Sequence, residues 1–366
     1  MKKFCLSLLV IFILSSTPAL AVTKAVAPKA KAPWKPATPT GYTPITWAKA
    51  PGIASFFKAP DNGGAIDFIT RIYLPQNQIG FIVSTTTPLN LGLTSPDISS
   101  TTTTAFEQIS NLSASPNLSF PRFGAEATKS INPSIKFLWN APFFNMKPTF
   151  SDLSMAIKYS LATSTVISSG ARSVPDMAQE RRMLLINNQT GKATIDVFDS
   201  EKFIDDKNGD QALEGFAPTV AKSDGGSGAS RLFLGVTDNN QELVVYCSQL
   251  ATVAEASEAL TEAGISPDHQ LQADGGGSAS CGYNLPGQFF VEPTRTLPLL
   301  MGAETILMRG TITTKDTNVR IGPATKNPVK LKLPKGISVK VFEEKNGWYR
   351  IGQSEWVIKS LIKQSS

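Results

Sequence analysis

The chain has 366 residues, of which 41% are hydrophobic and 17% charged, a composition that supports a folded core and excludes a disordered protein. Its net charge of +6 is unevenly spread: residues 22–50 carry five lysines and no acid, residues 309–366 carry 12 Lys and Arg against 4 Asp and Glu, and residues 51–308 sum to −9. An acidic central region with basic ends suits attachment to an anionic envelope polymer, but the lysines could equally serve solvation alone. No basic helix, zinc spacing or aromatic-basic motif indicates a nucleic-acid partner.

The first 21 residues have the pattern of a secretory signal. Lys2 and Lys3 precede the apolar run Leu6–Leu14, and Ala19-Leu20-Ala21 is a small-residue cleavage site. The apolar run is too short to span a bilayer, so no transmembrane anchor is predicted in the mature chain. We therefore predict a signal peptide over 1–21 and an exported protein, periplasmic or extracellular and associated with the cell envelope.

Residues 22–50 are rich in Pro, Ala and Lys and are predicted to be an extended linker. A large domain over 51–308 follows. Alternating apolar residues predict strands within Ala65–Ser84, and Ile135–Trp139 reads as a buried strand that ends at Asn140. Two further strands flank Asn187–Gly191, which has the composition of a hairpin turn.

The segment before residue 274 has the most specific local signals. Apolar strands Leu232–Val236 and Glu242–Tyr246 are joined through a turn at 238–240. Thr252 and Glu255 form a capping box for a helix that ends before Gly264, and a strand over His269–Ala273 follows. Strands mixed with helices predict an α+β fold, a mixed β-sheet domain with flanking helices.

Removal of the signal takes Cys5 with it and leaves Cys247 and Cys281. In an oxidising compartment these two are expected to form a disulfide bond. If the preceding hairpin turns near Asn239, Arg231 lies opposite Cys247, and the disulfide would hold Arg231 close to the chain just before Cys281.

That chain is the glycine-rich stretch Asp274-Gly275-Gly276-Gly277-Ser278. Consecutive glycines permit positive φ angles and let the backbone amides form an anion-binding concavity beside a carboxylate and a hydroxyl. A tight turn that needs glycine for geometry alone is the alternative.

The residue types present limit the chemistry. His269 is the only histidine, which excludes a two-histidine zinc site, and in a regular strand it would point away from Asp274. No metal site is predicted. The candidates that remain suit glycoside or phosphate-ester chemistry, and they are Asp274, Arg231, Arg295, Asn140 and Ser278.

Four segments resemble the phosphodiester glycosidase family. They are Ser230–Gly235, Thr252–Gly264, Asp274–Ser278 and Arg295-Thr296-Leu297-Pro298, and Asn140–Phe144 resembles the family's Asn-Gly-Gly-Phe-Phe segment. The resemblance implies a hydrolase that cleaves a sugar–phosphate linkage in a glycan or glycan-phosphate substrate. In that case Arg231 and Arg295 hold the phosphate, the amides of Gly275, Gly276 and Gly277 cradle it, and Asp274 is the acid/base or nucleophile. Asn140 and Ser278 orient the sugar. No cofactor is predicted, and the question of a divalent cation stays open.

Residues 309–366 resemble a bacterial SH3 domain. Thr317–Pro323 matches its opening signature, and Gly336, Asn346–Tyr349 and Glu355–Val357 fit its later strands. The resemblance implies a small all-β barrel that binds a cell-wall peptide or glycan. Its aromatic residues serve either the barrel core or ligand contact. A non-catalytic envelope-binding protein therefore stands as the alternative to the enzyme.

Overall fold

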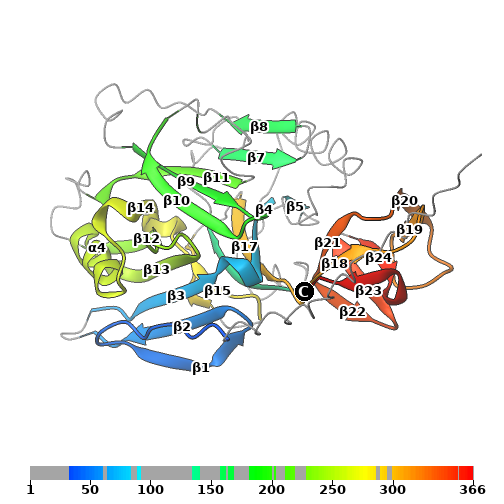
Figure 1. The fold of residues 1–366 in the computed structure, drawn as a ribbon. Coiled ribbons are helices and arrows are strands. Elements are labelled where there is room, and N and C mark those ends of the chain that lie inside the picture. The colour runs from blue at the N-terminus through cyan, green and yellow to red at the C-terminus, as the bar shows by residue number, and fades with distance from the viewer. Residues whose placement is uncertain are drawn as a thin grey trace, which may run out of the picture. The chain divides into compact units, whose positions relative to one another are not determined.

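The computed structural model describes residues 33–60, 64–83, 89–91, 134–140, 157–161, 164–168, 181–199, 202, 211–218, 228–285, 289–294, 299–352 and 354–365. Among these residues, two β-sheets build the body of the molecule and two smaller sheets build a C-terminal barrel (Figure 1).

The larger sheet of the body begins at the N-terminal edge with two hairpin-connected strands. Neighbouring strands are antiparallel at every pairing described. Its strands, along the sheet, are β1 (Thr43–Ala50), β2 (Ile53–Lys58), β3 (Asp67–Tyr73), β13 (Glu242–Ala251), β12 (Ala229–Val236), β14 (Gln270–Gly275), β11 (Gln211–Phe216), β7 (Ile157–Leu161) and β8 (Ser164–Ser168), with β9 (Arg181–Asn187) on β11 and β10 (Lys192–Val197) on β9.

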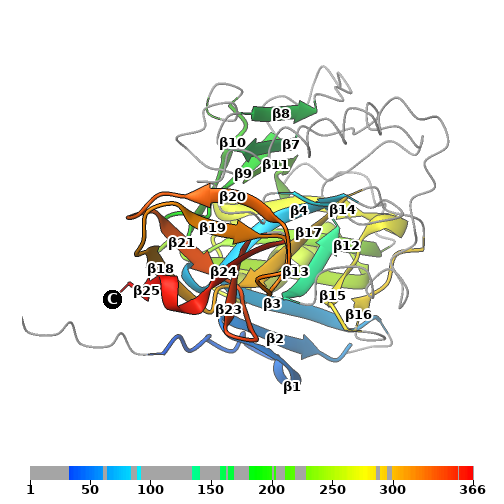
Figure 2. The ribbon, with the colours of Figure 1, turned by 90° about the vertical axis from the view of Figure 1, so that its right-hand side faces the viewer.

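The second sheet of the body is also antiparallel. Its strands are β16 (Phe289–Val291), β15 (Cys281–Tyr283), β6 (Ile135–Asn140), β17 (Leu299–Thr305), β4 (Asn77–Val83) and β5 (Leu89–Leu91). The turned view in Figure 2 shows β4, β15 and β17 together with the strands of the larger sheet.

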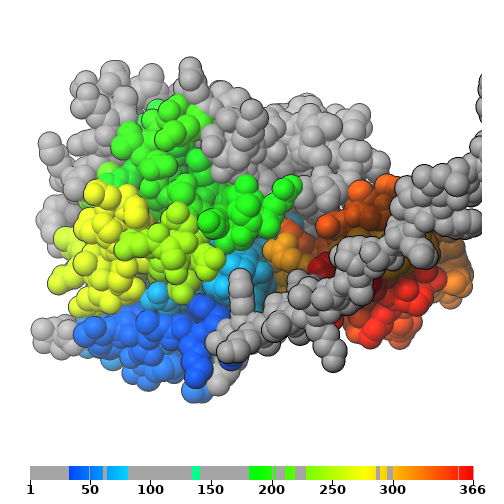
Figure 3. All heavy atoms as spheres, in the orientation of Figure 1, coloured from blue at the N-terminus to red at the C-terminus, as the bar shows by residue number. Residues whose placement is uncertain are grey.

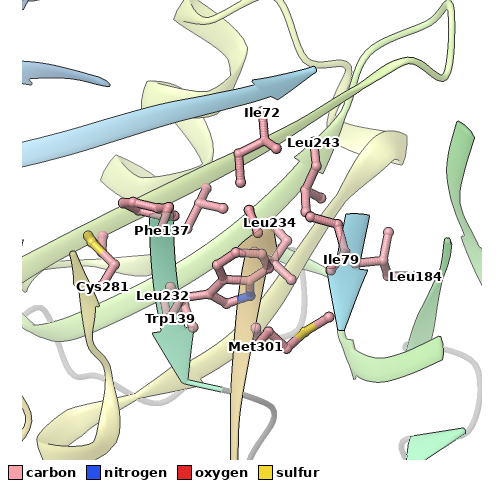
Figure 4. Packing of buried hydrophobic residues seen from close by; sticks show 14 of the residues in the cluster. Ile72, Ile79, Phe137, Trp139, Leu184, Leu232, Leu234, Leu243, Cys281 and Met301 are labelled. Atoms are coloured by element: carbon pink, nitrogen blue, oxygen red, sulfur yellow. A yellow bond between two sulfur atoms is a disulfide. The ribbon is translucent and has the colours of Figure 1, made fainter. Parts of the chain in front are cut away.

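The main hydrophobic core lies between these two sheets. Phe137 and Trp139 of β6 pack with Met301 of β17 against Leu232 and Leu234 of β12, and all five side chains are fully buried (Figure 4). Full burial of one such side chain stabilises the folded protein by roughly 1.5–3 kcal/mol.

One α-helix, α4 (Val253–Glu262), occurs among the described residues. Its buried residues Val253, Ala256 and Leu260 pack on Phe233 and Tyr246, which face away from the main core. The helix begins with the predicted capping box, in which Thr252 accepts from the Glu255 amide and the Glu255 carboxylate accepts from the Thr252 amide.

The prediction of an α+β fold with flanking helices is wrong. The described part of the chain is dominated by curled antiparallel sheets and has a single α-helix on the outer face of the larger sheet. The helical signal at 252–264 is real, but it belongs to one connection, from β13 to β14. In the described part of the chain, packing of the two sheets on each other buries the remaining apolar strands.

Residues 43–50 are a second correction. They were assigned to the linker, but they form β1, which pairs with β2 and buries Ile45 and Ala48. Backbone pairing with an adjacent strand outweighs the weak apolar composition of this segment. The signal peptide and the remaining domain boundaries stay predictions.

The barrel combines a sheet of β18 (Met308–Ile312), β21 (Ser338–Val341) and β25 (Ile362–Gln364) with a five-stranded sheet. The five strands are β20 (Val329–Leu333), β19 (Thr317–Arg320), β24 (Glu355–Ile358), β23 (Trp348–Gly352) and β22 (Glu343–Lys345). Val319, Val341, Ile351 and Val357 fill its own core. The predicted all-β barrel is present.

Candidate functional site

The predicted disulfide joins the two sheets of the body. Cys247 of β13 and Cys281 of β15 are bonded, with their Cα atoms 6.4 Å apart. The prediction from the cysteine count is confirmed. The bond lies at the end of the body that also carries Asn140, because Cys281 pairs with Trp139 in the ladder of β15 and β6.

The strand register places Asp274 at the edge of the main core. Leu232 of β12 lies opposite Asp274, whereas the next residue, Phe233, lies opposite Gln272, so β14 contains a bulge at this point. A bulge re-aims the side chains beside it. Asp274 is 2% exposed, and its side chain reaches β6 of the other sheet.

Asn140 provides the contact from that sheet. Its Nδ2 donates to Asp274 Oδ2, and its Oδ1 accepts from the Ser280 amide at 2.9 Å. The Ser280 bond fixes which end of the amide faces the carboxylate. The second carboxylate oxygen, Oδ1, accepts from the Gly275 amide at 2.7 Å. Asp274 and Asn140 are thus in contact, and that they form a catalytic site stays a prediction.

Arg231 lies beside the glycines but one residue away from its predicted register. It pairs with Ser248 rather than Cys247, because the loop between β12 and β13 closes with the Thr237 amide bonded to the Glu242 carbonyl. Its Nε donates to the Ala251 carbonyl at 3.1 Å, and the side chain is buried.

Arg231 also lies opposite Gly275 in the ladder of β12 and β14. A Cβ atom at Gly275 would meet Arg231 Nη1 at 2.9 Å. The absent side chain therefore makes room for the guanidinium.

The three glycines have different roles. Gly275 is extended, with φ −161°, whereas Gly276 has φ +66° and starts the short 3-10 helix Gly276–Ser278. Gly276 thus needs the conformational freedom of glycine, while Gly275 needs the space. Ser278 is buried, and the Gly277 carbonyl accepts from the Thr294 amide at 2.9 Å. That these amides hold an anion remains a prediction.

Other predicted residues fall outside this cluster. Arg295 lies outside the described residues. His269 precedes β14 at the opposite end of the strand from Asp274, where its Nδ1 is 3.3 Å from Asp238. Sequence reasoning missed Ser280, whose carbonyl accepts from the Asn140 amide and whose amide donates to Asn140 Oδ1. It also missed the Ala251 carbonyl, which accepts from Arg231 Nε. Neither carries a sequence signal, because both act through backbone atoms.

A cavity of about 530 Å³ lies next to Ala251, whose carbonyl accepts the hydrogen bond from Arg231. Ala251 lines it together with Asp67, Lys58, Glu255, Glu258 and Glu262, among others. Burial raises the pKa of the Asp67 carboxyl, although the Tyr246 hydroxyl donates to Asp67 Oδ1 at 2.8 Å and partly offsets that rise. Burial, followed by the charge of Asp67, also raises the pKa of Tyr246.

Within the part of the chain that the structure describes, no group of three or more His, Cys, Asp or Glu side chains could hold a metal ion. Likewise, no described helix has both the length and the apolar character needed to cross a bilayer.

The solved structures to which this chain is similar include the following two, and both similarities are weak. The zebrafish N-acetylglucosamine-1-phosphodiester alpha-N-acetylglucosaminidase catalytic domain, auto-inhibited by its pro-peptide, is 13% identical, with 70% of this chain and 84% of that chain covered and a TM-score of 0.44. A hypothetical protein from Synechocystis is also 13% identical, with 72% and 64% covered and a TM-score of 0.37. At these scores neither similarity carries the functional argument.

No curated protein matched the chain. The C-terminal region gave a family match: residues 315–363 match the family model described as Bacterial SH3 domain. The match falls within the barrel whose strands and separate core are described above. The C-terminal part of this chain is therefore a bacterial SH3 domain, a type of domain associated with cell-wall binding.

Proposed function

We propose that the protein is an exported hydrolase that cleaves the sugar–phosphate linkage of a phosphodiester-linked glycan, with the SH3 domain attaching it to the envelope. The observation that carries the proposal is the contact between Asp274 and Asn140, which come from different sheets. Arg231 lies opposite the neighbouring residue Gly275 in the ladder of β12 and β14. A guanidinium can bind a phosphate through two hydrogen bonds, and a carboxylate can act as a general acid or base, so these groups suit such a reaction.

In the proposed reaction, Arg231 binds the phosphate. Asp274 either takes a proton from the water that attacks the anomeric carbon or attacks that carbon itself, and in the second case water then hydrolyses the glycosyl ester and frees the carboxylate. Asn140 holds the Asp274 carboxylate in place and contacts the sugar. The bond from the anomeric carbon to the phosphate oxygen breaks, and the phosphate leaves as a monoester. A phosphate needs less protonation than a sugar hydroxyl to leave, which fits a cluster without histidine.

Localisation outside the cytoplasm is part of the same proposal. The disulfide between Cys247 and Cys281 and the SH3 domain are both consistent with an exported or envelope-associated protein. Neither feature depends on catalysis.

A non-catalytic binding protein is the second candidate. Both oxygens of Asp274 accept hydrogen bonds inside the protein and its side chain is 2% exposed, a setting that also suits a purely structural carboxylate. In that case the cluster joins the two sheets, and binding to the envelope is the function.

Turnover of a GlcNAc-phosphodiester and of related chromogenic substrates separates the two candidates. We expect the wild type to release phosphomonoester and Asp274→Asn to lose at least about 100-fold in rate, the scale of a lost acid/base group. Asp196→Asn, an exposed carboxylate on β10, is the matched control and should keep full activity. Unchanged turnover in Asp274→Asn would refute the role of Asp274. A wild type that binds wall polymer but turns over no substrate in the panel would favour the second candidate.

A further inference from the structure

The aromatic residues of the SH3 domain are not available as a binding surface. Trp348, Tyr349 and Trp356 are 7%, 8% and 7% exposed, and Phe342 is 3% exposed. The sequence left two roles open for these aromatic residues, the barrel core and ligand contact. Their burial within the described barrel favours the core and leaves little aromatic surface for a ligand. A neutral peptide or sugar that binds by stacking on these rings would find them covered.

The same domain exposes lysines instead. Several of its cations are engaged: Lys340 and Arg350 are buried in contacts, and Lys330 pairs with Glu355. Other lysines are exposed and form no ion pair with any described carboxylate; they are Lys315, Lys326, Lys332, Lys335, Lys345 and Lys363.

Four of these six lysines belong to one hairpin and its flanks. Lys332 lies on β20, Lys326 in the turn between β19 and β20, and Lys315 and Lys335 immediately outside the two strands. Residues 315–335 contain six Lys and Arg against one acid, Asp316. β20 is the last strand of its sheet, so this charge lies along a sheet edge; part of the barrel surface is visible in orange and red in Figure 3.

Edge lysines also prevent strands of different molecules from pairing, which is the simplest explanation for one or two of them. That role needs charge on the edge strand alone. Here the charge extends into the turn at Lys326 and beyond both strands to Lys315 and Lys335, where there is no open strand edge to protect.

We infer that the β19–β20 hairpin of the SH3 domain is a binding surface for a phosphate-containing polyanion of the cell envelope. Lysine ammonium groups attract phosphates along a polymer without requiring one fixed geometry. A single-stranded nucleic acid is disfavoured, because base stacking needs exposed aromatic rings and the aromatic residues named above are buried. The inference specifies the attachment part of the proposed function, and it holds whether or not Asp274 catalyses a reaction.

The test measures binding of the full-length mature protein to purified poly(glycerol phosphate) over a range of salt concentrations. The variant Lys326→Gln/Lys332→Gln/Lys335→Gln removes three charges from the hairpin. We expect its affinity to fall at least about 10-fold at low salt and the slope of log affinity against log salt to become shallower by about 2.

The matched control removes three exposed charges elsewhere, in Lys192→Gln/Lys202→Gln/Lys345→Gln. Lys345 lies on β22 at the other edge of the same sheet, so the control also tests whether the hairpin itself matters. We expect the control to bind within about two-fold of wild type. Circular dichroism on both variants shows that they are folded.

Three outcomes would overturn the inference. Equal losses in the two triple variants would show that net charge alone acts, and binding that does not change with salt would exclude an ionic surface. Tighter binding to single-stranded DNA of equal charge than to poly(glycerol phosphate) would assign the surface to nucleic acid. Because none of these measurements uses turnover, the result is independent of the Asp274→Asn assay.

Discussion

Gly275 and Gly276 are adjacent, yet the structure gives them different physical requirements. Gly276 has φ +66°, so alanine there is strained by about 1 kcal/mol regardless of the surrounding space. Gly275 is extended, and alanine there is opposed by Arg231 Nη1 at 2.9 Å, the far end of a flexible side chain.

We therefore predict that Gly276→Ala lowers the free energy of unfolding by about 1 kcal/mol. Gly275→Ala should change it by less, because the guanidinium can move aside, but it should weaken phosphate-dependent binding or turnover. Urea denaturation of both variants measures the change in stability. A turnover assay, or the shift in melting temperature on adding inorganic phosphate, measures the effect on the site. Equal effects of the two substitutions on stability would contradict it.

Asp67 gives a prediction about pH. Its folded-state pKa is raised by burial, so the folded protein binds this proton more tightly than the unfolded chain does. Stability from this group is fully present below the unfolded pKa of about 4 and is lost as the pH rises through the folded pKa.

Asp67→Asn should remove this loss, because asparagine keeps an oxygen for the Tyr246 hydroxyl and cannot ionise. The difference in unfolding free energy between variant and wild type should therefore shift in favour of the variant as the pH rises from 4 to 7. Asp196→Asn, on an exposed strand position, should show no such trend. A constant difference across this pH range for Asp67→Asn would refute the argument.

Secondary-structure elements differ in how far their own sequence determines them. The helix α4 was predicted because its capping box and its Gly264 end are local signals. The hairpin of β9 and β10 was predicted for the same reason, from its Asn187–Gly191 turn. β1 was missed because its strand conformation depends on pairing with β2, and no residue of 43–50 indicates that pairing.

Only some of the long-range contacts could be predicted from the sequence. The two cysteines that remain after removal of the predicted signal allow one pairing, so the disulfide followed from a count. The register of β12 on β13 was wrong by one residue, because the length of the connecting loop and not its most turn-like residue sets the pairing. The contact of Asn140 with Asp274 spans 134 residues and two sheets, and no pattern within either segment encodes it.

The disulfide yields a prediction at this scale, because it links β13 and β15 across the main core. Its loop has a sequence separation of 34 residues, for which the chain-entropy estimate is about 3–4 kcal/mol. Cys247→Ser/Cys281→Ser should lose about that much stability in urea denaturation, and a reducing agent should destabilise the wild type but not this variant. If reduction leaves the wild type unchanged, the bond contributes nothing to stability.

At the scale of the whole molecule, the SH3 domain is held to the body by buried charges. Residues 34–365 form one compact unit, and two residues, Ile306 and Leu307, separate β17 of the body from β18 of the barrel. Arg350 of β23 donates to Ser134 Oγ at 2.6 Å and to Glu304 of β17, and the Arg350 and Glu304 side chains are 5% and 0% exposed.

Lys340 of β21 makes a second set of contacts. Its Nζ donates to Gln78 Oε1 at 2.8 Å and to the Asn188 carbonyl at 2.9 Å, and Lys340 is itself 6% exposed. Asn188 in turn exchanges two hydrogen bonds with the backbone of Ile79 in β4. Buried charged groups of this kind are costly to leave without their partners.

We therefore predict that the domain and the body unfold together. Arg350→Met leaves Glu304 buried without its cation and should cost about 3–5 kcal/mol, whereas Arg350→Met/Glu304→Met removes both charges and should recover much of that loss. Lys359→Met, which breaks the half-exposed pair with Glu344, is the control and should cost less than about 1 kcal/mol. Calorimetry should show one transition for the wild type. Two separate transitions in the wild type would contradict this prediction. So would a double variant whose loss equals the sum of the losses in Arg350→Met and Glu304→Met. Either result would mean that only the connecting chain attaches the domain to the body.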